Sequence, residues 1–358
     1  MKKSVAILVC FLFILVLSGC SLSSGTALPG ATSKYVFSKS LSISKDGGRT
    51  WADSITATTR PRVTDIDPLS FVFDPKDENT AYVGLRTGGL MKTINGGESW
   101  EFLTFNTEKI YGLAIDQADS RIIYASTVVA GRGKIFKNSA AGATDAWNEI
   151  YTAATNGPLV IYMTLDKNNA KTIYVSTSDN QVMKTVDGGV SWRSLFQATS
   201  PVIKIALDAK NSNLVYILTK NGEILSSSNG GDKFDSLAAK IIVPGITGSS
   251  FSVMETDPSN TGWVYLAGNS GMIRSKDAGE KWESVVILNN PQNSPVGALA
   301  INPQNSKEII YGALQATYKS VDDGKSWTTS QFDLSKNINI LEYNPLNPNI
   351  VYAGFRGK

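Results

Sequence analysis

The chain has 358 residues, with 34 lysines and arginines against 31 aspartates and glutamates, two cysteines and no histidine. The lack of histidine excludes Ser-His-Asp and Cys-His catalysis and histidine-ligated zinc or iron. Two cysteines are too few for a four-thiolate metal site, so we expect no metal and no cofactor. A net charge of +3 is too small to indicate nucleic-acid binding. The apolar fraction of 42% allows a large core, and many short polar breaks favour an all-β chain.

Residues 1–19 have the pattern of a lipoprotein signal peptide. Lys2 and Lys3 precede a 13-residue apolar run, Val5 to Leu17, which is too short to span a bilayer comfortably. The segment Leu17-Ser18-Gly19-Cys20 follows and resembles a bacterial lipobox. The resemblance implies diacylglycerol transfer to the Cys20 thiol and cleavage before this residue. An ordinary signal peptide or an N-terminal anchor helix is the alternative interpretation.

Residues 20–33 are small and polar, which predicts a lipid-anchored flexible tether. Lipidation of Cys20 would hold the protein at a membrane without spanning it. Ser21 is not the Asp expected for inner-membrane retention. We therefore expect the outer membrane in a diderm host and the outer face of the plasma membrane in a monoderm host.

The rest of the chain, residues 34–358, repeats the motif Ser/Thr-x-Asp/Asn-x-Gly-x-x-Trp/Phe. Six good copies and one degenerate copy, Asn138 to Trp147, end in aromatic residues 42 to 49 positions apart. A period in this range is typical of a propeller or a solenoid. The Asp or Asn of the six good copies is Asp46, Asn95, Asp187, Asn229, Asp277 or Asp322.

A second motif runs in phase with the first: an apolar-x-apolar strand, Asp or Asn, a short polar turn, and Tyr. Its seven copies are Phe71–Tyr82, Leu113–Tyr124, Met163–Tyr174, Ile205–Tyr216, Met254–Tyr265, Leu299–Tyr311 and Leu341–Tyr352. Each unit therefore reads as strand A, an Asx turn, strand B, a variable loop, strand C, an Asp-Gly turn and strand D. Four short strands in each unit form a propeller blade.

The two ends of the repeat region complete one another. The N-terminal part begins with strand C, around Phe37 to Ile43, and strand D, whereas the C-terminal part, Ile338 to Phe355, stops after strands A and B. Pairing them would complete a seventh blade and remove the open edges. The predicted fold is an all-β, seven-bladed propeller with four-stranded blades, closed by pairing N-terminal with C-terminal strands. We expect a monomer.

The repeated motif resembles the Asp box of bacterial neuraminidase repeats (BNR). Residues 34–358 look like the BNR-type propellers of photosystem II assembly and stability factors, sortilin-like domains, sialidases and other glycoside hydrolases. This resemblance implies the fold strongly and the function weakly. The Asp or Asn side chain can accept backbone N–H bonds across the turn, and Gly supplies the positive φ. A structural role is favoured over sugar or metal binding, because function rarely needs seven equivalent copies.

Binding is expected on the face formed by the B–C and D–A loops, opposite the Asp-box rim, because those loops vary. Five of the nine arginines are assigned to this face over three consecutive blades: Arg60, Arg62, Arg86, Arg132 and Arg356. Guanidinium groups suit carboxylate or phosphate ligands. The alternative is a solvated surface with interspersed acidic residues.

An enzymatic alternative needs two carboxylates near the central channel. At the middle position of the strand A motif, Glu255 and Glu342 stand where the other units have Val, Ala or Thr. They either form an acid/base pair or are solvated at a channel mouth. The Arg-Ile-Pro element of sialidases is absent before the first Asp box, which argues against sialidase activity.

The function predicted from the sequence is a cell-envelope scaffold that binds an acidic protein segment or a glycan. The alternative is a sialidase- or xyloglucanase-like glycoside hydrolase that uses Glu255 and Glu342.

Overall fold

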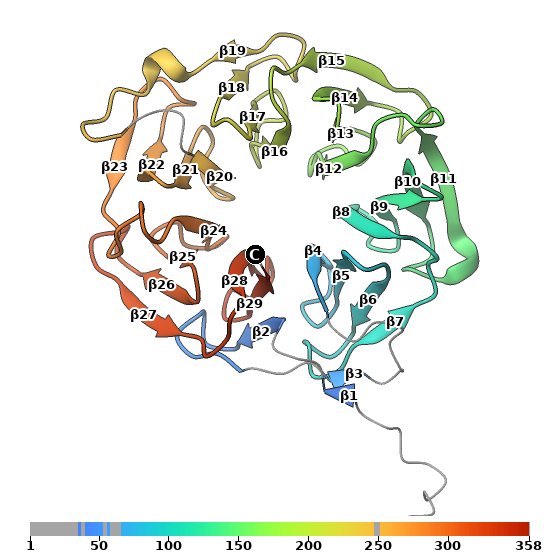
Figure 1. Ribbon diagram of the computed structural model, residues 1–358, viewed down its shortest axis with the longest axis horizontal. Helices are drawn as coiled ribbons and strands as arrows, with labels where there is room; N and C mark the ends of the chain where they lie inside the picture. Colours follow the sequence, from blue (N-terminus) through green and yellow to red (C-terminus); the bar gives the residue numbers. More distant parts are fainter. Residues whose placement is uncertain (1–34, 37–39, 53–55, 58–65, 247–250, 358) are drawn as a thin grey trace, which may run out of the picture. The chain divides into compact units, whose positions relative to one another are not determined.

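The computed structural model describes residues 35–36, 40–52, 56–57, 66–246 and 251–357. These residues belong to one compact unit, Lys34–Lys358. The predicted signal peptide, Cys20 and the tether lie outside the described residues. Seven antiparallel sheets surround a central axis and form a seven-bladed β-propeller, as the sequence predicts (Figure 1). No helix in the described ranges is long and apolar enough to cross a membrane.

Six blades are four-stranded meanders in which strand order follows the chain. The first three contain β4 (Pro68–Phe73), β5 (Ala81–Leu85), β6 (Leu90–Thr93) and β7 (Glu101–Leu103); β8 (Lys109–Ile115), β9 (Ile123–Val129), β10 (Arg132–Asn138) and β11 (Trp147–Thr152); and β12 (Val160–Leu165), β13 (Ile173–Thr177), β14 (Gln181–Thr185) and β15 (Arg193–Gln197). The next three contain β16 (Val202–Leu207), β17 (Val215–Thr219), β18 (Ile224–Ser227) and β19 (Asp235–Ser236); β20 (Phe251–Thr256), β21 (Val264–Gly268), β22 (Gly271–Ser275) and β23 (Glu283–Val285); and β24 (Val296–Ile301), β25 (Ile309–Ala313), β26 (Ala316–Ser320) and β27 (Thr328–Gln331). The first strand of each blade faces the centre of the ring and the last lies at its periphery (Figure 1).

The seventh blade joins the two ends of the ring. It contains β28 (Asn337–Tyr343) and β29 (Val351–Arg356) from the C-terminal end and β2 (Leu41–Ser44) from the N-terminal end. Strand β2 pairs antiparallel with β29 from Leu41↔Gly354 to Ser44↔Val351. In place of a fourth strand, this blade has the single bridge Ile43↔Ala52, directly before residues 53–55, which lie outside the described residues.

Four short elements lie outside the seven blade sheets. Strands β1 (Tyr35–Val36) and β3 (Thr56–Ala57) pair with each other as a separate two-stranded sheet. Two 3₁₀ turns, η1 (Thr144–Ala146) and η2 (Ala238–Lys240), occupy connections near the outer strands.

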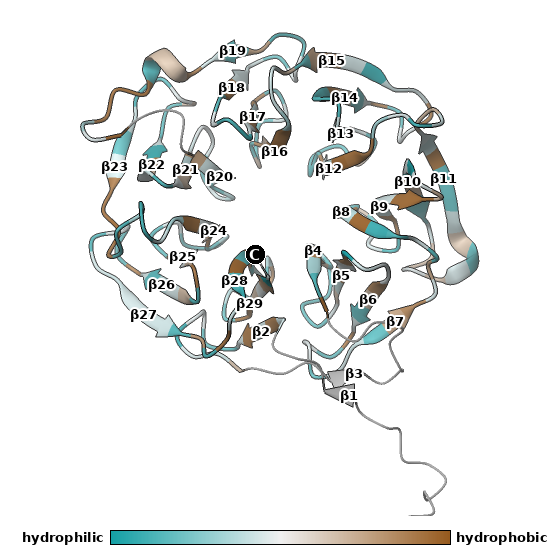
Figure 2. Ribbon diagram, in the orientation of Figure 1, coloured by the Kyte–Doolittle hydropathy of each residue, from teal (hydrophilic) through white to brown (hydrophobic). Residues whose placement is uncertain are grey.

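The core lies between neighbouring blades, because both faces of each second strand are covered. Every residue of β5, β13, β17, β21 and β25 is buried. The tyrosine that recurs on strand B is fully buried in all seven blades, at Tyr82, Tyr124, Tyr174, Tyr216, Tyr265, Tyr311 and Tyr352. Figure 2 shows hydrophobic residues along inner strands such as β12, whereas β27 at the periphery is mostly hydrophilic.

Several of these tyrosines and a strand C cation also bond to the next blade. Tyr174 Oη and Lys184 Nζ both donate to the carbonyl oxygen of Gly230, at 2.9 and 2.8 Å. Lys319 Nζ donates in the same way to Gly47 O across the closing junction, at 2.6 Å. These bonds fix the position of one blade relative to the next, beyond what apolar contact alone would fix.

The A–B turn and the C–D turn share one rim of the ring, as the sequence predicts. In every blade a backbone N–H of the C–D turn donates to a carbonyl of the A–B turn. The seven pairs are Gly96–Asn79, Ala141–Arg121, Gly188–Lys171, Gly230–Asn213, Ala278–Gly262, Asp323–Lys307 and Gly47–Asn349. The B–C and D–A loops therefore form the opposite face.

Candidate functional site

A β-bulge recurs in the innermost strand of all seven blades. The extra residues are Leu69, Tyr111, Ile161, Ile203, Ser252, Gly297 and Asn339. All seven line a cavity of about 520 Å³ in the central channel. A bulge leaves one residue unpaired and bends the strand, so the seven bulges together shape the part of the channel nearest the B–C and D–A loops.

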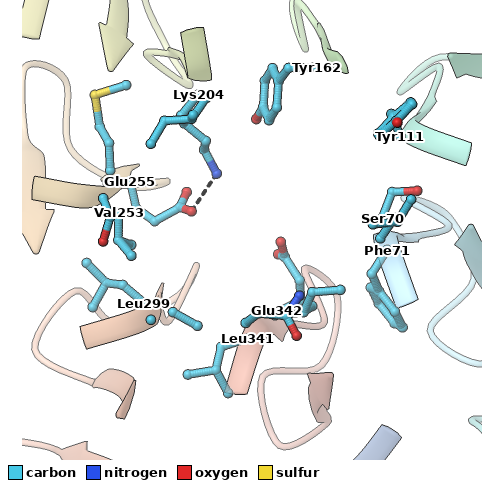
Figure 3. Close-up of a pocket in the computed structure, with 18 of the residues that line it drawn as sticks. Ser70, Phe71, Tyr111, Tyr162, Lys204, Val253, Glu255, Leu299, Leu341 and Glu342 are labelled. Atoms are coloured by element: carbon cyan, nitrogen blue, oxygen red, sulfur yellow. Dashed lines mark hydrogen bonds and ion pairs between the residues drawn. The ribbon is translucent and has the colours of Figure 1, made fainter. Parts of the chain in front are cut away.

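A second cavity of about 300 Å³ continues the channel toward the A–B turns, where Pro75, Lys167 and Pro345 line it. Seven residues line both cavities and define the waist of the channel: Phe71, Leu113, Tyr162, Met163, Lys204, Glu255 and Glu342. The four polar side chains at the waist point into the same space from three neighbouring blades and the closing blade (Figure 3).

One of the two waist glutamates is paired. Lys204 Nζ lies 2.5 Å from Glu255 Oε1, and each side chain is less than one third exposed. Although enclosure in the channel opposes its charge, the two glutamates raise the pKa of Lys204. Enclosure also raises the pKa of the Tyr162 hydroxyl. The Lys204 ammonium therefore stays protonated at neutral pH and forms an ion pair with Glu255.

The other glutamate, Glu342, accepts no hydrogen bond or ion pair from any described residue. Its side chain is accessible to water inside the channel, but the ring surrounds it with protein. This enclosure, together with the charge of Glu255, raises the pKa of Glu342 to about 7, while Lys204 and Lys167 act in the opposite direction. Near neutral pH this carboxyl group is therefore divided between its protonated and ionised forms.

The structure brings together two of the five arginines assigned to the loop face. Arg86 Nε lies 2.6 Å from Asp67 Oδ2, and Arg356 Nε lies 3.5 Å from Asp67 Oδ1. Arg356 also lines the larger cavity. Arg132 does not join them, because its guanidinium donates to the carbonyl oxygen of Ala153 in its own blade. Arg60 and Arg62 lie outside the described residues.

The residues of the repeated Asp/Asn position hold the C–D turns. Each of the six accepts a hydrogen bond from the backbone N–H four positions later, that of Thr50, Ser99, Ser191, Lys233, Lys281 or Ser326. In the degenerate copy, Asn138 Oδ1 accepts from Gly142 N at 2.9 Å, as a Ser or Thr hydroxyl does in the other copies. No group of three or more His, Cys, Asp or Glu residues in the described part could hold a metal ion.

Sequence reasoning missed Lys204 and Tyr162. Each stands directly after the bulge of its strand, two residues before the position that holds a glutamate in β20 and β28. The available signal was the same comparison across repeats that found the glutamates: at this earlier position, the seven repeats have Ser70, Gly112, Tyr162, Lys204, Val253, Ala298 and Ile340. A lysine and a tyrosine in this series indicate a polar channel wall.

Comparison with known proteins gives partial matches. No family model matches the chain. Xyloglucanase Xgh74A of Acetivibrio thermocellus is 28% identical in a match that covers 35% of this chain and 19% of the enzyme. The oligoxyloglucan-reducing end-specific xyloglucanase of Emericella nidulans is 37% identical over 17% of this chain and 8% of the enzyme. The chain thus spans a fifth or less of the length of these curated relatives.

Solved structures match more of the chain. The GH74 xyloglucanase of Xanthomonas campestris has a TM-score of 0.65 at 16% identity, covering 81% of this chain and 51% of the enzyme. YCF48 of Cyanidioschyzon merolae has a TM-score of 0.62 at 14% identity, covering 82% of this chain and 97% of YCF48. A structure of YCF48 bound to D1 peptide gives 0.61 at 14% identity, covering 81% and 93%. Likeness at these identities shows the propeller fold alone.

Proposed function

We propose that this chain is a lipid-anchored protein of the cell envelope whose propeller binds an acidic polypeptide segment on the face of the B–C and D–A loops. The observation that carries the proposal is the convergence of Arg86 and Arg356 on Asp67 beside the mouth of the larger cavity. Two guanidinium groups share one carboxylate, so the trio keeps a net positive charge. Both arginines remain partly exposed and can donate to a ligand carboxylate.

The structural relatives support a polypeptide as the ligand. The match covers 97% of YCF48 and 82% of this chain. Another structure shows YCF48 bound to D1 peptide. Arg60 and Arg62 precede Ile66 and Asp67 in the sequence, and we propose that they add positive charge to the same binding surface. A rigid ring that displays loops at one face suits such binding.

The experiment uses a fluorescein-labelled peptide of eight glutamates, with polygalacturonate as the glycan competitor. We expect the double variant Arg86→Ala/Arg356→Ala to bind the peptide about tenfold more weakly at low salt, because two charge-assisted contacts are lost. Arg121→Ala is the matched control, since Arg121 is exposed and pairs only locally with Asp119 on the opposite rim.

Equal binding of the peptide by the double variant and by Arg121→Ala would rule out Arg86 and Arg356 as the binding site. Complete displacement of the peptide by polygalacturonate, with direct and tighter binding of this polymer, would assign the face to a glycan instead.

The glycoside hydrolase alternative rests on the matches to xyloglucanases and on two waist carboxyl groups in different states. Glu255 forms an ion pair with Lys204, whereas the pKa of Glu342 is raised, and two carboxyl groups in such different environments are typical of acid/base pairs. The closed ring argues against it, because both groups lie at the waist between two cavities, where a polysaccharide can enter only by its end. The test is hydrolysis of xyloglucan and of aryl glycosides: activity that Glu255→Gln and Glu342→Gln both abolish would establish the enzyme.

A further inference from the structure

The waist of the channel repeats one arrangement twice, but the second copy lacks its cation. In β20, the first residue that pairs with β21 after the bulge is Val253, and Glu255 stands two residues later. In β16 of the preceding blade, the first residue that pairs with β17 after the bulge is Lys204, which forms the ion pair with Glu255. Glu342 occupies the same register position in β28. The residue of the preceding blade that corresponds to Lys204 is Ala298 in β24.

Ala298 lines the larger cavity beside Glu342 but carries only a methyl group. Glu255 therefore has an ammonium group as its partner, whereas the corresponding residue of the blade before Glu342 supplies no cation. We propose that the channel waist binds an organic cation of the primary alkylammonium class, whose ammonium group pairs with Glu342 and whose apolar body lies in the larger cavity. This proposal is independent of the acidic-peptide function.

The cavity walls fit such a ligand. Its partly exposed aliphatic and aromatic lining includes Leu69, Phe71, Ile161, Ile203, Val253 and Ile340. An alkyl chain that leaves water for this lining gains free energy in proportion to its buried area. The volume of about 520 Å³ exceeds what a six-carbon chain requires. Arg356 lines the larger cavity but not the second one, so its positive charge lies toward the mouth and not at the waist.

The charges at the waist also favour a cation. Two carboxyl groups and a phenol face one lysine at the waist, and Lys167 lies further toward the A–B turns, so an ionised Glu342 has no ion-pair partner among the described residues. Titratable and charged groups that act on Glu342 come from β20, β16, β12 and the turn after β12: Glu255, Lys204, Tyr162 and Lys167. The flanking blades contribute only Ser70, Val72, Ala298 and Ala300 at the corresponding channel positions.

Binding must release a proton. Below its raised pKa of about 7, Glu342 is mostly protonated, and pairing with an ammonium requires the ionised form. The proton leaves to solvent when the ion pair forms, so affinity rises with pH between about pH 6 and 8. Lys204 and Tyr162 keep their protonation state over this range, because the pKa of each is raised.

The test is calorimetric titration of the chain with n-hexylammonium, with 1-hexanol and hexanoate as neutral and anionic probes of the same length. We expect n-hexylammonium alone to bind. Glu342→Gln should weaken its binding at least about tenfold, because a charged partner is lost. Glu280→Gln is the control, since Glu280 is exposed on the other rim and pairs with Lys240. Titration at pH 6.5 in two buffers of different ionisation enthalpy should show proton release with wild type.

A gain-of-charge variant tests the register argument directly. Ala298→Lys should supply the missing ammonium, exclude n-hexylammonium and leave the melting temperature unchanged or higher. Failure of n-hexylammonium to bind wild type at millimolar concentration would overturn the proposal. Equal affinity for Glu342→Gln, or equal affinity for hexanoate, would overturn it as well. Peptide binding through Arg86 and Arg356 is measured separately and is not affected by these outcomes.

Discussion

At the scale of single residues, six of the seven C–D turns depend on one buried hydroxyl group, and the turn of the second blade uses the amide oxygen of Asn138 instead. Ser275 is almost fully buried; its Oγ accepts from Gly279 N at 2.8 Å and donates to Asp277 Oδ1 at 2.9 Å. Thr93 and Thr185 do the same in other blades. In these six turns the position therefore needs the hydroxyl group as an acceptor, and the extra methyl group of threonine is optional.

We expect Ser275→Ala to lower the free energy of unfolding by about 1–3 kcal/mol, because the buried Gly279 N–H loses its acceptor. Ser275→Thr should cost far less, since threonine fills this place elsewhere in the ring. Urea unfolding of the two variants measures the difference. Equal loss in both would mean that volume, and not the hydrogen bond, decides at this position.

The raised pKa of Glu342 makes the free energy of unfolding decrease as the pH rises. The folded state binds this proton more tightly than the unfolded state, whose glutamate titrates near its ordinary value of 4.5. The stability that this group provides is thus complete below about pH 4.5 and is lost as the pH rises through about 7. Glu342→Gln does not titrate, so we expect its advantage in melting temperature over wild type to increase from pH 5 to pH 8. A constant difference over this range would contradict the raised pKa.

At the scale of elements, the junction between the fifth and sixth blades replaces a lysine–carbonyl bond with an ion pair. Asp323 stands where four other C–D turns have glycine and two have alanine, and it keeps the positive φ of that position, 66°. Its carboxylate accepts from Arg274 Nη2 at 2.8 Å, and Arg274 Nε also donates to Glu283 at 2.7 Å. The Arg274 side chain is only 9% exposed, so the guanidinium depends on these partners.

We expect Asp323→Gly to relieve the strained φ and yet destabilise the ring by roughly 2 kcal/mol, because it leaves a buried cation short of one partner. Adding Arg274→Lys should recover part of this loss, since Lys184 donates to the carbonyl of Gly230 at the equivalent junction. A double-mutant cycle by urea unfolding measures the coupling. Strictly additive effects of the two substitutions would mean that the Arg274–Asp323 ion pair does not take the role of the lysine–carbonyl bond at this junction.

The propeller could be predicted from the sequence because its signals are local. The Asp-Gly turns and the strand B tyrosines each define a strand boundary within a few residues, and their spacing gives the blade number. The strand after Asp46 was predicted as a full fourth strand, but only the bridge at Ala52 is present in the described residues.

Contacts between blades were harder to predict. The glutamates at 255 and 342 could be assigned to the channel by comparing repeats. The pairing of Glu255 with Lys204 depends on the bulge in each inner strand and on the offset between blades, and neither has a local sequence signal. The arginine group depends on side-chain direction in the same way: Arg132 turns back to the carbonyl of Ala153 instead of joining Arg86.

At the scale of the whole molecule, ring closure rests on β2. We expect Ile43→Pro to cost about 3 kcal/mol or more, because it removes the N–H that donates to Ala52 O and distorts the pairing with Tyr352. Ile43→Val is the control, since it keeps the backbone bonds and most of the side chain. Urea unfolding and limited proteolysis measure the effect. Similar behaviour of both variants would mean that the ring is stable without this pairing.

The position of β2 also determines when the ring can be completed during synthesis. A chain is made from its N-terminus, so residues 41–44 emerge before the six complete blades and wait until residues 351–356 are made. Six blades can form in order during that interval, but both edges of the closing sheet remain open to other strands. The stage most open to aggregation is therefore the one at which six blades have formed and the closing sheet is still unpaired, and a chaperone that covers β2 would protect the chain at that stage.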